Sequence, residues 1–170
     1  KQEFEMQNRI YDLIRKQYDF LNEAEYLVDR IGKSFLANPD AVVYAYPDSK
    51  EHIHYQIFAT VQPLIDAHRK YLFEPMKKVL FEQGKYIRSG IFELYKDWTR
   101  GCFGSYVEYI DNLAETLLFM DFEKDFKKSS EFLEWLDTFP AEPISPKKFL
   151  SNYFFYNLVL YKNSLIDIKK

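Results

Sequence analysis

The sequence predicts an all-α fold, an elongated bundle of about six helices. Apolar residues recur at steps of three and four along most of the chain, which is the period of one helix face. The 170 residues include 16 Phe, 14 Tyr and 2 Trp but only 5 Gly and 7 Pro. That composition is typical neither of a glycine-rich all-β domain nor of a disordered chain. The length predicts a single domain over residues 1–170.

The first predicted helix is the longest. Apolar residues from Phe4 to Phe35 follow the helical period, and polar residues, Glu23 among them, fill the opposite face. We expect the helix to end near Asn38, because the residue before a proline is disfavoured in the α region. At a rise of about 1.5 Å per residue the helix approaches about 50 Å, which implies an elongated bundle.

The next segments alternate between turn signals and helices. Ala41–Tyr46 is short and apolar and fits either a helix or a strand. Asp48 and Glu51 form a D-x-x-E capping box that predicts the start of a second helix. Pro63 is expected to stop or kink that helix and to begin another. The latter should run to about Phe81 and be capped at its carboxyl end by Gly84.

The C-terminal half divides into further predicted helices. They span residues 86–98, 103–119, 123–136 and 149–168. The glycines at 101 and 104 are expected to break the first from the second, and a proline-rich connector over 138–146 precedes the last. The last segment is apolar nearly all round; its composition would also fit a buried strand, but its length favours a helix.

Charge and cysteine content exclude several classes of protein. A formal net charge of -3 gives no electrostatic basis for binding nucleic acid or an anionic membrane. The single cysteine cannot form an internal disulfide, and no apolar run approaches the ~18 residues of a membrane span. These features predict a cytoplasmic protein that does not insert into a membrane, with recruitment to the cell cortex left to other domains.

The sequence carries few residues in patterns that predict catalysis. His52 and His54 lie two apart on a predicted helix and so point to different sides, which favours solvated side chains over a metal site. His68 is interpreted as a hydrogen-bonded histidine of the core or its edge, and Cys102 as a buried thiol. We therefore expect no cofactor, no metal and no covalent chemistry, and favour a protein-binding surface.

Three segments resemble the Dbl-homology domain of Rho-family guanine nucleotide exchange factors. Ile10–Leu27 is similar to the opening helix of that family, with its pattern I-Y-E-L-I-x-T-E-x-x-Y-V-x-D-L. Ile57–Leu72 is similar to F-x-N-I-x-x-I-x-x-x-H-x-x-F-L, with His68 in register. Tyr106-x-x-Tyr109-x-x-Asn112 follows Trp98 as in the W…Y-x-x-Y-x-x-N helix. Together they span roughly residues 9–120 in the order of the family.

The resemblance implies a GTPase-binding surface on the first and last helices. In the better register Gln17 stands where the family has a glutamate that contacts the first switch of the GTPase, and Glu23 falls on a later aspartate position. A shifted register would place Glu23 on that glutamate, but it puts Asp19 at a core leucine. The stretch Asn152–Tyr161 corresponds to P-V-Q-R-x-x-(K/R)-Y, with Leu160 at the basic position. The candidate contacts are Gln17, Glu23, Asn157, Lys162 and Asn163.

The implied function is nucleotide exchange on a Rho, Rac or Cdc42-type GTPase. The alternative is a degenerate Dbl-like scaffold for docking or dimerisation, and an unrelated helical bundle is a third possibility. The long final helix of the family would lie beyond Lys170. Without it, we expect the apolar face Tyr153–Tyr161 to be covered by a second copy or a neighbouring domain.

Overall fold

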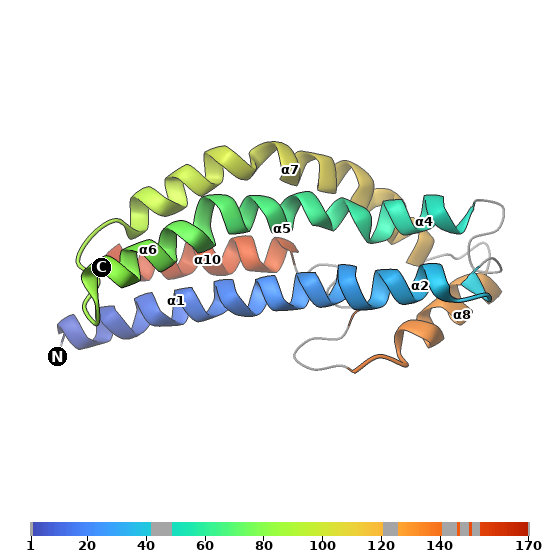
Figure 1. Cartoon of the computed structure of the whole chain (residues 1–170), viewed down its shortest axis with the longest axis horizontal. Helices are drawn as coiled ribbons and strands as arrows, with labels where there is room; N and C mark the ends of the chain where they lie inside the picture. The colour runs from blue at the N-terminus through green and yellow to red at the C-terminus, as the bar shows by residue number, and fades with distance from the viewer. Residues whose placement is uncertain are drawn as a thin grey trace.

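A computed structural model describes the backbone of residues 2–41, 49–120, 126–140, 146, 150 and 154–169. It describes side chains within 3–41, 49–113, 131–140, 146, 150 and 161–168. Over these residues the chain is helical and contains no strand, which confirms the predicted all-α class. The molecule is elongated, with the N- and C-termini at the same end (Figure 1).

Three helical segments follow one another without a break at the start of the chain, and we call them the first rod. These are α1 (Gln2–Glu25), the π-helical turn η1 (Tyr26–Gly32) and α2 (Lys33–Ala37). Asn38 has an extended ψ of 120°, so the rod ends just before Pro39 as predicted.

Five consecutive helical segments form a second rod. These are α4 (Lys50–Ile57), η2 (Ala59–Val61), α5 (Gln62–His68), η3 (Arg69–Phe73) and α6 (Glu74–Gln83). Pro63 lies in the first turn of α5, directly after a 3₁₀ turn, and Gly84 follows α6 with a φ of 69°. Both positions confirm the sequence prediction.

The N-cap of α4 differs from the prediction by one residue. The hydroxyl of Ser49 accepts a hydrogen bond from the His52 backbone N–H at 3.1 Å. Ser49 is therefore the capping residue, and Asp48 lies outside the described residues, as does most of the Ala41–Tyr46 segment. Ala41 itself is helical and buried.

The predicted break at the two glycines is wrong. Helix α7 runs without interruption over Ile91–Met120. It begins after Gly90, whose φ is 93°, and not at Tyr86 as the sequence pattern predicted. A Cβ on Gly101 would lie 2.6 Å from ring atoms of Tyr71, so this glycine allows α7 to pass close to η3. A glycine that permits close approach has the same sequence signature as one that ends a helix.

Two further helices complete the described chain. α8 (Phe126–Leu136) and α10 (Phe154–Lys169) confirm the last two predicted helices, while residues 123–125, 149 and 151–153 of the predicted ranges lie outside the described residues. The strand alternative for the last segment is excluded, since residues 154–169 are helical. Most of the connector over 138–146 lies outside the described residues.

The two rods run antiparallel along the molecule, and α7 arches over the second (Figure 1). α10 packs along α1, while α5 and η3 pack against both α1 and α7. α8 lies at the end of the molecule opposite the termini (Figure 1). This arrangement places α1, α5, α7 and α10 around one shared interior.

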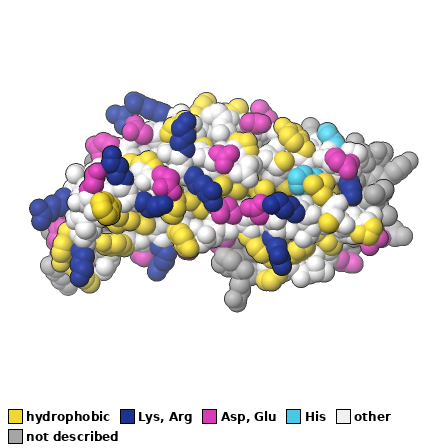
Figure 2. All heavy atoms as spheres, viewed as in Figure 1, with side chains coloured by type: hydrophobic (Ala, Val, Ile, Leu, Met, Phe, Trp, Pro, Cys, Tyr) yellow, Lys and Arg dark blue, Asp and Glu magenta, His cyan; other side chains and the backbone are white. Residues whose placement is uncertain are grey.

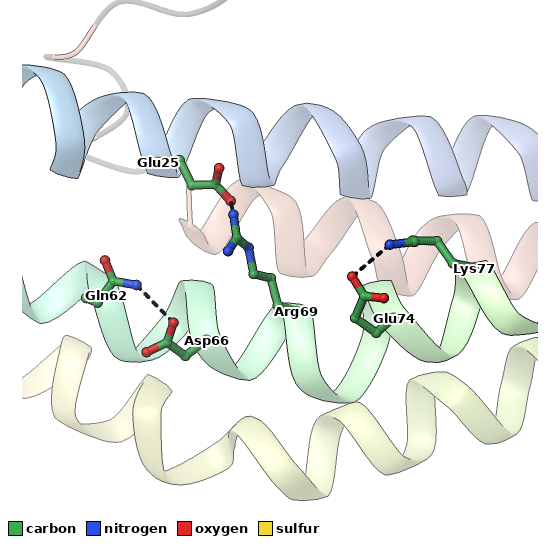
Figure 3. A network of polar contacts seen from close by, with 6 residues as sticks. All are labelled: Glu25, Gln62, Asp66, Arg69, Glu74 and Lys77. Atoms are coloured by element: carbon green, nitrogen blue, oxygen red, sulfur yellow. Dashed lines mark hydrogen bonds and ion pairs between the residues drawn. The ribbon is translucent and has the colours of Figure 1, made fainter.

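Surface ion pairs lie both between and within helices and add little stability. Arg69 of η3 pairs with Glu25 of α1, and Lys77 pairs with Glu74 at 2.9 Å within α6 (Figure 3). Partly exposed pairs of this kind typically contribute about 0–1 kcal/mol each. Basic and acidic side chains are interspersed over the face in Figure 2. No helix in the described part of the chain is both long and apolar enough to cross a membrane.

A buried polar hub between the first and last helices

Gln17 is buried in the structure. Its side chain is 0% exposed, so the expectation that it lies on the solvent face of the first helix is wrong. The buried residues of the rod recur at heptad spacing, and Gln17 occupies one of these positions. The buried residues in this heptad series are Ile10, Leu13, Gln17, Phe20, Ala24, Leu27 and Ile31. The helical period therefore directs Gln17 into the interior together with its apolar neighbours.

Aromatic side chains from other helices surround the Gln17 amide. Two of them bond it directly, and the third bonds one of those two. The Tyr161 hydroxyl of α10 donates to Gln17 Oε1 at 2.8 Å. Gln17 Nε2 lies 3.0 Å from His68 Nδ1 of α5, and His68 Nε2 lies 2.8 Å from the Tyr106 hydroxyl of α7. We call these four residues, Gln17, His68, Tyr106 and Tyr161, the polar hub. The hub joins α1, α5, α7 and α10 through hydrogen bonds.

His68 is a neutral imidazole at the centre of the hub. Its side chain is fully buried, and desolvation lowers its pKa from 6.5 to about 3. A neutral ring has one donor and one acceptor nitrogen, so either tautomer bonds both Gln17 and Tyr106. Phe20 packs on the ring at a centroid distance of 4.3 Å and Trp98 at 5.1 Å. These contacts confirm the prediction of a hydrogen-bonded core histidine.

The burial of His68 predicts a loss of stability on acidification. The unfolded chain binds a proton near pH 6.5, whereas the folded chain binds it only near pH 3. The contribution of His68 is therefore fully present above pH 6.5 and is lost as the pH falls towards 3. Between about pH 7.5 and about pH 5 we expect a loss of about 2 kcal/mol in the free energy of unfolding.

Urea unfolding at these two pH values measures that loss. His68→Asn removes the titrating group and should reduce the pH dependence by the stated amount, whatever its effect on stability itself. His52→Asn, at an exposed position, is the matched control and should keep the wild-type dependence. An unchanged pH dependence in His68→Asn would contradict the assignment.

The hub holds four helices in register through hydrogen bonds between buried side chains. Among the described residues, no group of three or more His, Cys, Asp or Glu side chains is placed to hold a metal ion. Cys102 is buried, as predicted, and burial raises the pKa of its thiol to about 11. A thiol with a raised pKa is a poor nucleophile near neutral pH. What the hub fixes is the position of α10 along α1.

The flank of α10 next to the hub is open to solvent. Lys162 and Asn163 directly follow Tyr161 and are exposed, as expected for contacts with a partner. Arg9 donates to the backbone carbonyl of Asp167, and Lys16 Nζ donates to the Ser164 hydroxyl at 3.3 Å. These bonds fix α1 and α10 side by side in antiparallel orientation. α1 and α10 correspond to the first and the last of the predicted helices.

Two of the predicted site residues lie elsewhere than expected. Glu23 is 8% exposed, so its assignment to the solvent face is wrong, as it is for Gln17. Asn157 belongs to α10, but its side chain lies outside the described residues. Lys162 and Asn163 are therefore the predicted contacts that the structure places on the surface. Their role in binding a GTPase stays a prediction.

The fold and the site define an all-α bundle in which the first and last helices pack together beside a buried polar hub. No protein-family model matches the chain, and no solved structure matches it either. The chain is similar to the Rho1 guanine nucleotide exchange factor TUS1 of Saccharomyces cerevisiae, with 29% identity over 136 residues. The match covers 79% of this chain but 10% of TUS1, so the chain spans about a tenth of that protein. The similarity indicates a relationship to Rho-type exchange factors.

Proposed function

We propose that this chain is a guanine nucleotide exchange domain that binds a Rho-family GTPase and promotes release of GDP. The observation that carries the proposal is the similarity to the Rho1 exchange factor TUS1 over 79% of the chain. The packing of α10 along α1 supports it, because the resembled family uses these two helices for the GTPase. The chain performs no covalent chemistry in this proposal.

Exchange of this kind is a linkage between two binding equilibria. A partner that binds the nucleotide-free GTPase more tightly than the GDP-bound form must weaken GDP binding by the same factor. The protein therefore needs a rigid surface that the nucleotide-bound GTPase cannot fit without rearrangement. The hub supplies rigidity, since its hydrogen bonds hold α10 against α1 from inside.

Burial of Gln17 changes the assignment of roles within this surface. A side chain that is 0% exposed does not contact a partner, so Gln17 is a positioning residue in this proposal. The contacts come from the exposed flank of α10, where Lys162 provides a positive charge. A cation here can form charge-assisted hydrogen bonds with a carboxylate of the GTPase.

Release of fluorescent GDP from a panel of Rho, Rac and Cdc42-type GTPases tests the proposal. The chain is expected to accelerate release from at least one of them, and Lys162→Glu should reduce that acceleration about tenfold or more through charge repulsion. Lys78→Glu, at an exposed lysine of α6, is the matched control and should retain the wild-type rate. Wild-type acceleration in Lys162→Glu would exclude the α10 flank as the contact surface.

A catalytically degenerate scaffold is the second candidate function. The burial of both Gln17 and Glu23 favours it, because neither presents a carboxylate or amide on the surface where the resembled family has its glutamate. The same assay separates the two functions when it is combined with a pull-down. A scaffold binds the GTPase and leaves the rate of GDP release unchanged, whereas an exchange domain increases that rate.

A further inference from the structure

Helix α7 carries an apolar stripe on its outer side. Phe103 is 68% exposed, Ile110 43% and Val107 41%, and all lie on one helical face. They border a groove of about 230 Å³ whose accessible lining is apolar, with Trp98 and Cys102 also in its lining. Isolated exposed apolar side chains are ordinary, but a continuous stripe around a groove is typical of an interaction surface.

Two charges of opposite sign flank this stripe. Arg100 and Asp111 are exposed, and neither forms an ion pair with another residue in the described part of the chain. Eleven residues make about three turns, so both side chains lie on the same flank of α7. The positive charge lies on the N-terminal side of Phe103 and Val107, and the negative charge on their C-terminal side.

The apolar stripe and the two charges of α7 are complementary to the same features on a second, antiparallel copy of the helix. A two-fold axis near residue 105, the middle of α7, brings two antiparallel copies together with the same flanks facing. At about 1.5 Å per residue, Phe103 lies about 3 Å before the axis and Val107 about 3 Å after it, so each opposes the other in the second copy. Arg100 lies about 7.5 Å from the axis on one side and Asp111 about 9 Å from it on the other. The same two-fold rotation therefore places Arg100 of one copy opposite Asp111 of the second copy.

We propose that two copies of this chain associate through α7, antiparallel, with Phe103 against Val107 and Arg100 against Asp111 across the interface. The charge complementarity of α7 with its own reverse identifies a second copy as the occupant of the groove. This surface differs from the Tyr153–Tyr161 face considered from the sequence, of which Tyr161 is buried within the chain. The proposal does not rest on nucleotide exchange.

Sedimentation equilibrium from about 1 μM to about 200 μM covers the weak affinities expected of a small interface. The weight-average mass is expected to rise from 20.5 kDa towards twice that value. Phe103→Ser should keep the chain monomeric over this range, and its melting temperature should stay close to wild type because the side chain is exposed. A wild-type mass of one chain at every concentration would overturn the proposal and leave the groove to a different partner.

Reversing the charges at positions 100 and 111 distinguishes this antiparallel geometry from nonspecific hydrophobic association. Arg100→Glu or Asp111→Lys alone places like charges opposite each other in both pairs, and each variant should dimerise at least about tenfold more weakly. An equimolar mixture of the two variants restores attraction in both pairs, so it should form heterodimers, detectable by native mass spectrometry of differently labelled chains. Failure of the mixture to dimerise better than either variant would exclude the antiparallel pairing.

Discussion

Replacing Gln17 with leucine is expected to lower the free energy of unfolding by about 2–4 kcal/mol. Leucine fills a similar volume but accepts no hydrogen bond from Tyr161 and offers none to His68. Both partners are buried, so each loses its bond without gaining one to water. An unmet buried polar group typically costs about 1–3 kcal/mol, which is a large part of the stability of an ordinary domain.

Chemical denaturation of Gln17→Leu against Gln62→Leu measures this effect. Gln62 is exposed and bonds Asp66 at 2.9 Å on the surface (Figure 3), so its replacement should change stability by no more than about 0.5 kcal/mol. Equal stabilities for the two variants would show that the hub contributes nothing to the fold.

Gly101→Ala and Gly104→Ala are expected to change stability in opposite directions, although the two glycines lie three residues apart in one helix. A Cβ at Gly101 would meet the Tyr71 ring at 2.6 Å. Moving the ring away to relieve that overlap should outweigh the higher helix propensity of alanine, so Gly101→Ala should lower the free energy of unfolding by about 2 kcal/mol. A Cβ at Gly104 meets no atom within 4 Å, so alanine there should stabilise α7 by about 1 kcal/mol.

A second substitution tests the cause assigned to the Gly101 effect. In a Tyr71→Ala background the overlap is removed, and Gly101→Ala should then approach the behaviour of Gly104→Ala. Thermal unfolding of the four chains forms a double-mutant cycle. A cost for Gly101→Ala that persists without the Tyr71 ring would contradict close helix packing as its cause.

Local signals in the sequence predicted most of the fold. The helical period and Pro39 defined the first rod and its end, and Pro63 and Gly84 marked boundaries that the structure confirms. Gly101 was misinterpreted because its role depends on Tyr71, a residue on another helix. Composition cannot distinguish a glycine that ends a helix from one that admits a neighbour.

The site was predicted less well than the fold, for a related reason. The hydrogen-bond partners of Gln17 lie 51 and 144 residues away in sequence. A local sequence pattern therefore does not predict that its amide is hydrogen-bonded in the interior. One signal was available, since Gln17 stands at heptad spacing between Leu13 and Phe20. A polar residue at such a position is directed inward by the helical period, and this outweighs the solvent-facing role implied by the resemblance.

The proposed function depends on a difference in affinity for two forms of one GTPase. The most direct measurement is isothermal titration of the chain against a responsive Rho-family GTPase, once nucleotide-free and once loaded with GDP and Mg²⁺. Linkage predicts binding at least about tenfold tighter to the nucleotide-free form. Equal affinity for both forms, or binding to neither across the Rho, Rac and Cdc42 classes, would contradict exchange as the function of this chain.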